Sequence, residues 1–128
     1  ASRPMADPAR DKALSELVAR VRGLTGPVGM TEAREIALFA REQAGLKALA
    51  SDYLRCALEH GDLNAAERLR QVVLPGSCIT TDTSGLRTYV VVYRVSAERT
   101  FEEGRVKHTS EPLARVLAVL TALEAAGQ

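Results

Sequence analysis

Tryptophan is absent from this sequence, and aromatic residues are scarce: the 128 residues include three tyrosines and two phenylalanines. A site that binds a flat ligand by stacking it between aromatic rings is therefore not expected. The sequence also has no apolar run long enough to span a bilayer and no internal repeat, which excludes a membrane-spanning segment and a solenoid. A chain of this length matches one domain with a single hydrophobic core, so we expect one domain over residues 1–128.

Cysteine is rare as well, since Cys56 and Cys78 are the two in the sequence. Two cysteines are too few for a disulfide framework, and no secretory signal follows Met5, where a charged helix is predicted instead. These absences predict a cytoplasmic protein. We interpret residues 1–4 as a vector remnant before a natural start at Met5, and we expect residues 1–6 to be disordered.

Neither sign of charge is in excess, because 17 basic residues stand against 16 acidic ones. The balance holds along the chain, with +5 and −3 over residues 1–30, +6 and −7 over 31–74, and +6 and −6 over 75–128. Strong binding to phosphates usually shows as a basic excess, so nucleic acid is not a favoured partner. Fourteen of the basic residues are arginine, which favours a bacterial, GC-rich source.

Apolar residues at helical spacing predict four helices in the first 74 residues. Asp7 followed by Pro8 is a favourable helix start, and Thr31 is a candidate cap for the second helix. We expect Leu49 and Leu63 on the buried faces of the third and fourth helices. The predicted helices cover residues 8–22, 31–44, 46–59 and 63–74.

The composition changes after Gly76, where residues 79–81 and 86–95 are rich in β-branched and aromatic side chains. These segments predict a hairpin that turns at residues 82–85. Both alternating faces of residues 89–93 are apolar, which predicts a central strand covered on both sides. A third short strand is expected near residues 105–109, after a turn at Glu103 and Gly104. The predicted fold class is α+β, with four N-terminal helices, an antiparallel sheet of two to three strands over about residues 77–109, and a hydrophobic C-terminal helix.

The C-terminal helix, expected over residues 111–126 with Ser110 as its cap, has apolar residues on most of its faces. Such a helix is either sandwiched in the core or shared with a second subunit. Its apolar side chains are therefore the candidate residues of an interface between two copies of the chain: Leu113, Val116, Leu120 and Leu123.

Titratable residues that could support catalysis or metal binding are few, the candidates being Asp52, Cys56, His60 and His108. With Cys78 they include two cysteines and two histidines, an inventory that suits zinc. However, the spacing Cys-x3-His-x17-Cys-x29-His does not match a zinc finger, and no third residue is placed to orient a thiol–histidine pair. The sequence therefore predicts no catalytic residue, no metal and no cofactor, and an enzyme remains a minor alternative.

The order of three helices, a hairpin and a terminal helix also fits a winged helix-turn-helix regulator of transcription. In that alternative Arg68 and Arg70 lie on the helix that reads DNA, Arg87 lies on the wing, and the last helix pairs two subunits. The neutral charge of the chain argues against it, as do acidic Asp62 and Glu67 on the reading helix.

Surplus hydrophobic surface supports the leading functional hypothesis. The terminal helix and the doubly apolar strand together offer more such surface than a short sheet easily covers. We therefore predict a small non-enzymatic binding or regulatory protein that acts through protein–protein contacts, as a homodimer.

Overall fold

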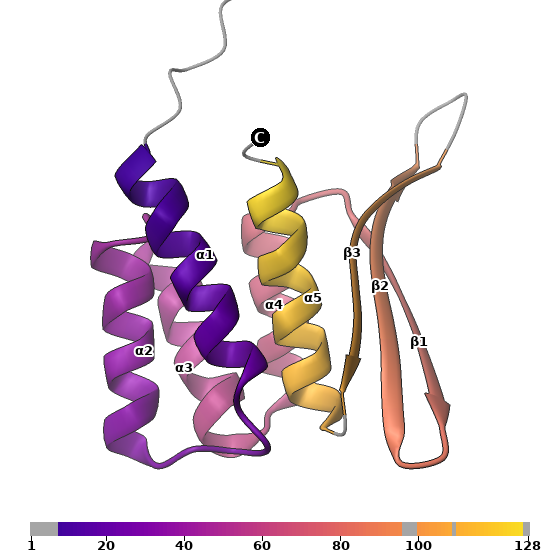
Figure 1. The fold of residues 1–128 in the computed structure, drawn as a ribbon, viewed down its shortest axis with the longest axis horizontal. Coiled ribbons are helices and arrows are strands. Elements are labelled where there is room, and N and C mark those ends of the chain that lie inside the picture. Colours follow the sequence, from indigo (N-terminus) through magenta and orange to yellow (C-terminus); the bar gives the residue numbers. More distant parts are fainter. Residues whose placement is uncertain (1–7, 96–99, 109, 127–128) are drawn as a thin grey trace, which may run out of the picture.

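The predicted fold class is confirmed by a computed structural model that describes residues 8–95, 100–108 and 110–126. Five helices and a three-stranded antiparallel sheet follow in the expected order (Figure 1). Residues 1–6, which the sequence predicts to be disordered, lie outside the described residues. The elements are α1 (Pro8–Arg22), α2 (Met30–Glu42), α3 (Ala48–His60), α4 (Leu63–Val73), β1 (Cys78–Ser84), β2 (Arg87–Val95), β3 (Thr100–His108) and α5 (Glu111–Ala126).

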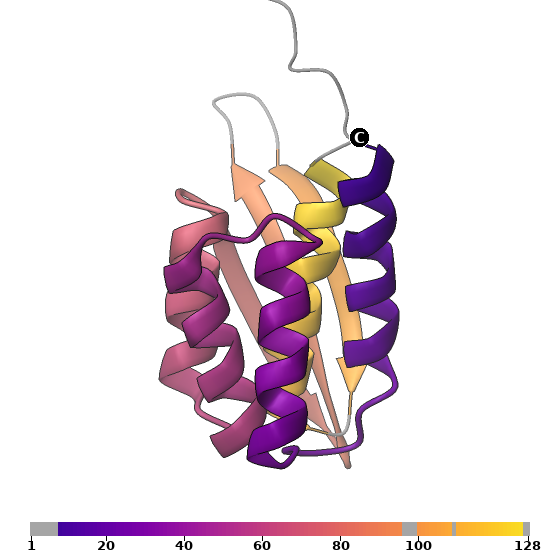
Figure 2. The same ribbon diagram turned by 90° about the vertical axis from the view of Figure 1, so that its left-hand side faces the viewer.

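Helix α5 lies between the sheet and the other helices, as two perpendicular views show (Figures 1 and 2). It contacts β2 and β3 on one side and α1, α3 and α4 on the other. Leu113, Val116 and Leu120 are at most 2% exposed, and Leu123 is partly buried against the same core. The first three are core residues of the single chain and offer no surface to a second subunit, which corrects their assignment as interface residues.

The N-terminal helices differ from the sequence predictions at individual positions. Helix α2 is preceded by Gly29, which provides no side-chain cap, and Thr31 lies inside its first turn. Leu49 is 53% exposed because the inner face of α3 is formed by residues such as Leu54 and Leu58, and Leu63 is exposed at the first position of α4. None of the described helices is long and apolar enough to cross a membrane.

The first hairpin turns later than the sequence predicted. Strands β1 and β2 pair up to Ser84 and Arg87, which leaves a two-residue loop of Gly85 and Leu86. Gly85 has a φ of +63°, a left-handed conformation that glycine adopts without steric cost, as type II′ hairpin loops require at this position. Residues 82–84, predicted as part of the turn, belong to β1.

The predicted turn at Glu103 and Gly104 is also wrong, because both residues lie inside β3. Val92 pairs with Gly104 and Tyr93 pairs with Glu102, so Glu103 is an additional residue in the β3 ladder. This arrangement is a β-bulge, a feature in which glycine is common. The pairing of β2 with β3 continues beyond the bulge as far as Val95 and Thr100.

The sheet is covered by helices on one face. On the inner face, Val90 and Val92 of β2 are fully buried beneath α5. Tyr89, Val91 and Tyr93 alternate with them and are only partly buried. Figure 1 shows the described helices on the inner side of the sheet, so the prediction of a strand covered on both sides is wrong. The reason is that α1 to α4 pack around α5 and each other, so none of them reaches the second face.

Candidate functional site

The titratable residues suggested by the sequence come from three elements: Asp52, Cys56 and His60 from α3, Cys78 from β1 and His108 from β3. Cys56 and His60 are on α3, where the Cys56 Sγ lies 3.7 Å from the Arg55 Nη2 and the His60 ring is exposed. Cys78 begins β1, and His108 ends β3. Within the described parts of the chain, no three histidine, cysteine or acidic side chains gather as they would around a metal ion.

His108 connects the loop after α1 with the start of α5. Its Nε2 lies 2.7 Å from the backbone carbonyl oxygen of Leu24, and its Nδ1 accepts a 2.9 Å hydrogen bond from the backbone N–H of Ser110. Because a carbonyl oxygen can only accept, Nε2 carries the proton. Both ring nitrogens are thus engaged with the backbone, one at the loop after α1 and one at the start of α5. This is a structural role for the histidine.

We expect His108→Ala to lower the free energy of unfolding by about 1–3 kcal/mol, because the backbone groups of Leu24 and Ser110 would lose their partner in a partly buried place. Urea denaturation followed by circular dichroism measures the change. His60→Ala is the matched control, since that exposed ring makes one contact, 3.8 Å from a Glu59 carboxylate oxygen, among those found in the described residues. Equal losses in the two variants would contradict the structural role of His108.

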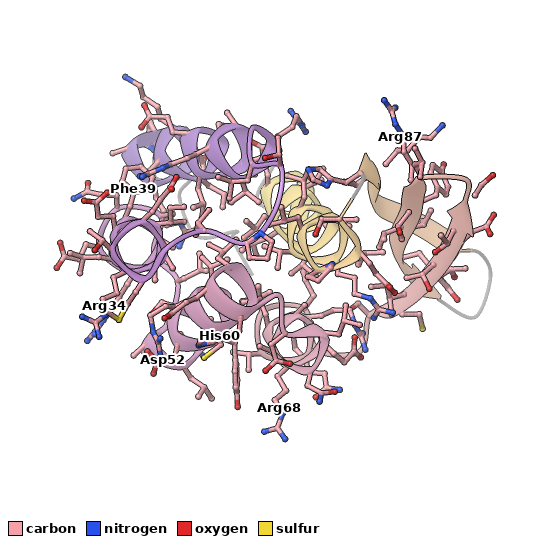
Figure 3. The ribbon with its side chains drawn as sticks, turned by 90° about the horizontal axis from the view of Figure 1, so that it is seen from below. Arg34, Phe39, Asp52, His60, Arg68 and Arg87 are labelled. Carbon is pink, nitrogen blue, oxygen red and sulfur yellow. The ribbon has the colours of Figure 1, made fainter. Side chains whose placement is uncertain are left out.

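The three arginines of the DNA-binding alternative do not share a surface. Arg68 on α4 and Arg87 on β2 are exposed, and Figure 3 shows them pointing outward from opposite sides of the molecule. Arg70 is mostly buried, with 11% of its side chain exposed. A duplex lying along α4 would therefore meet Arg68 without the other two.

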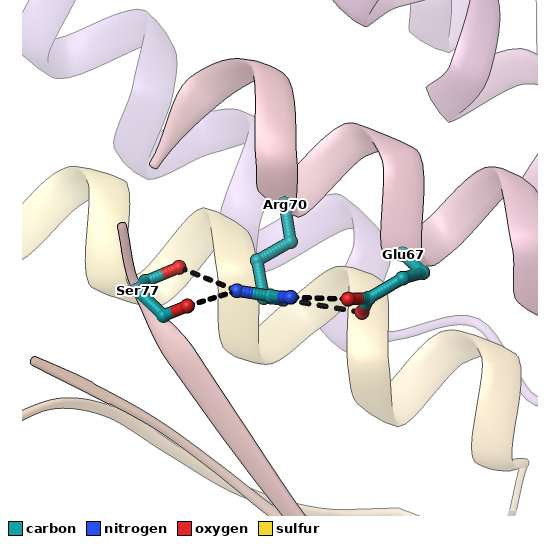
Figure 4. Close-up of polar contacts among 3 residues, drawn as sticks. All are labelled: Glu67, Arg70 and Ser77. Carbon is teal, nitrogen blue, oxygen red and sulfur yellow. Dashed lines mark hydrogen bonds and ion pairs between the residues drawn. The ribbon is translucent and has the colours of Figure 1, made fainter. Parts of the chain in front are cut away.

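Arg70 is held in a polar network that joins α4 to the start of β1 (Figure 4). Its guanidinium donates from Nε and Nη2 to the two carboxylate oxygens of Glu67, and from Nη1 to the backbone oxygen and the hydroxyl of Ser77. The hydrogen bonds from Arg70 hold the pKa of the Glu67 carboxyl below its usual value, against the opposing effect of burial. The same pairing raises the pKa of Arg70, which therefore stays charged. The role of the network is therefore structural: it holds the end of α4 to the start of β1.

An apolar cavity of about 500 Å³ opens where the ends of α1, α4 and α5 meet the turn between α2 and α3. Its walls include Leu14, Val73 and Leu123, the fourth residue predicted at the interface. Charged groups at the cavity come from Arg10, Asp11 and Lys47, and neither histidine nor cysteine is among the residues that line it.

The uncovered side of the sheet, which we call the outer face, is the strongest candidate for a functional surface. Its centre is the row of Tyr89, Val91 and Tyr93 on β2. Opposed residues of antiparallel strands point to the same side, so the register places Asp82 of β1 and Lys107 of β3 beside Tyr89. Both of these charged side chains are exposed. The outer face thus has an apolar and aromatic centre, with the acidic Asp82 on one border strand and the basic Lys107 on the other.

The outer face does not follow from the sequence of β2 taken without its neighbouring strands. Residues 80–84 of β1 are polar on both sides of the strand, so the pairing of Thr80 and Asp82 with Val91 and Tyr89 does not mark the exposed side in the sequence. The apolar pattern of β2 alone cannot distinguish a buried face from an exposed binding face.

Comparisons of this chain with protein-family models, with curated proteins and with solved structures find no match.

Proposed function

We propose that this chain is a small non-enzymatic binding or regulatory protein that acts through protein–protein contacts, as a homodimer. The observation that carries the proposal is the outer face, where Tyr89, Val91 and Tyr93 remain partly exposed although helices cover the opposite side of the sheet. Tyrosine is enriched at protein interfaces because it combines a large apolar ring with a polar tip. A row of two tyrosines and a valine suits a protein partner.

The distribution of reactive groups favours binding over catalysis. Cys56 and His60 lie on α3, and both nitrogens of His108 are engaged with the backbone of Leu24 and Ser110. A cytoplasmic setting in a bacterium belongs to the same proposal. It is supported by Cys56 and Cys78, which are both free thiols, and by the preference for arginine over lysine.

The positions of the arginines support protein contacts over DNA binding. A winged helix-turn-helix protein presents its reading helix and its wing to one duplex. Here Arg68 and Arg87 point to opposite sides, and Arg70 is engaged by Glu67 and Ser77. Arg68 is thus the only one of the three that is exposed on α4.

We expect light scattering to show the mass of a dimer that dissociates on dilution through the micromolar range, and Val91→Lys to shift the protein to the monomer. A lysine at the centre of the outer face would have to be desolvated without a partner. The control is Leu38→Lys on α2, which places the same charge at an apolar residue that is 54% exposed away from the sheet.

Two results would contradict the proposal. One is a strict monomer at all concentrations, together with no change in the nuclear magnetic resonance signals of the outer face when a lysate of the source organism is added. The other is a low-salt electrophoretic shift of duplex DNA that weakens steeply with salt and is lost in Arg68→Ala, because it would support the DNA-binding alternative.

A further inference from the structure

The borders of the outer face carry opposite charges at the same height along the strands. Asp82 on β1 and Lys107 on β3 both pair with Tyr89 on β2, so the three residues form one row across the sheet. β1 and β3 are the two edges of the sheet, with β2 between them. Adjacent strands lie about 4.8 Å apart, which places the acidic and basic positions roughly 10 Å from each other.

This row distinguishes between two ways of stacking two copies face to face about a two-fold axis through Tyr89. If the axis runs across the strands, β1 lies over β1 of the second copy and β3 over β3, so Asp82 cannot meet Lys107 at any height of the axis. At the height of Tyr89, Asp82 meets Asp82 and Lys107 meets Lys107. If the axis runs along β2, β1 of each copy lies over β3 of the other. Asp82 of each copy then meets Lys107 of the other, which makes two identical ion pairs. Like charges placed together at an interface cost free energy, and opposite charges fix the orientation.

We infer that the occupant of the outer face is a second copy of this chain, stacked about a two-fold axis parallel to β2, with Asp82 of each copy paired to Lys107 of the other. The inference rests on the proposed homodimer and adds its orientation. The arrangement is self-complementary, as a two-fold interface requires, because each copy supplies one acidic and one basic border. Tyr89, Val91 and Tyr93 of the two copies form the apolar centre.

The size of the outer face limits the area that two copies can bury. Three strands about 4.8 Å apart, the longest with nine residues rising about 3.3 Å each, give a footprint of roughly 400 Å² per copy. The total for two copies, roughly 800 Å², is below the roughly 1,000 Å² expected of a stable specific interface and corresponds to a weak, transient contact. The dimer is therefore expected to be weak, with a dissociation constant in the micromolar range, and sensitive to the charges at its borders.

The test is a charge exchange in the full chain, with dissociation constants obtained by analytical ultracentrifugation. We expect Asp82→Lys and Lys107→Asp each to weaken the dimer by about tenfold or more, because each turns both ion pairs into like-charge contacts. The double variant restores the pairs in reversed order and should return the constant to within a few-fold of the original. Glu32→Lys on α2, which changes the net charge as Asp82→Lys does, should leave the constant unchanged.

The outcomes separate this inference from the proposed function. A wild-type protein that stays monomeric at 200 µM overturns both the homodimer and its orientation. A dimer that dissociates in Val91→Lys but is unaffected by Asp82→Lys and Lys107→Asp keeps the proposed function and overturns the orientation inferred here. If the single variants weaken the dimer and the double variant does not restore its dissociation constant, the orientation is also overturned, provided that circular dichroism shows all variants folded.

Discussion

Leu120→Ala is expected to lower the free energy of unfolding by about 2–5 kcal/mol, the range found for leucines truncated in close-packed cores. Leu120 is fully buried in α5, the helix that contacts the sheet on one side and three helices on the other. Truncation leaves a cavity that few neighbouring atoms can move to fill, because the sheet encloses Leu120 on one side and the other helices enclose it on the other. Urea denaturation followed by circular dichroism measures the loss against a total stability of about 5–15 kcal/mol for a domain of this kind.

Leu49→Ala is the control for this prediction, because the same truncation on the exposed side of α3 should cost less than about 1 kcal/mol. Similar losses in both variants would show that α5 is not enclosed. A charged residue at position 120 does not test the dimer. It would unfold the chain, since a charge would be buried without a partner.

Glu67→Gln is expected to lower the free energy of unfolding by about 1–3 kcal/mol near neutral pH, since hydrogen bonds to charged groups contribute in that range. The loss should shrink as the pH falls below about 4. In the folded protein the Glu67 pKa lies below its usual value, because Arg70 donates hydrogen bonds to the carboxylate. The stability that the ionised form contributes is complete above the unfolded pKa and disappears as the pH falls through the folded one. Denaturation midpoints measured between pH 7 and 3 follow this change.

The pair of Arg20 and Glu35 provides the comparison for this prediction. These side chains lie 3.5 Å apart on α1 and α2 and are 41% and 64% exposed. Glu35→Gln should therefore cost less than about 0.5 kcal/mol at any pH, as is usual for ion pairs at the surface. A cost of Glu67→Gln that stays constant down to pH 3 would contradict the role assigned to the Arg70 network.

Local sequence signals predicted the helices better than the sheet. The bounds of α1 follow from Pro8 at its first position and Gly23 just after its end, and α5 follows from its apolar content. Residues 82–84 were misassigned because aspartate, threonine and serine are common both in turns and on exposed strands. Gly104 was misassigned because glycine at a bulge looks like glycine at a turn in the sequence.

The candidate site depended on information that the sequence of a single strand does not contain. Whether Tyr89 and Val91 are covered depends on how many helices reach the sheet, which is decided by the packing around α5. Arg70 was predicted at a DNA-binding surface because its spacing along α4 did not show that Ser77 would come within reach. The presence of Glu67 three residues before it was the available indication of a structural pair.

The central position of α5 has a consequence for the way the chain is made. The ribosome produces α5 after every element that packs against it, so the apolar sides of α1, α3, α4 and the sheet that face α5 emerge without their partner. Folding of the core requires contacts between segments that lie far apart in the chain. This slows folding and prolongs the exposure of apolar surfaces that are prone to aggregation. A chain interrupted before Glu111 would lack the helix that contacts both the sheet and α1, α3 and α4.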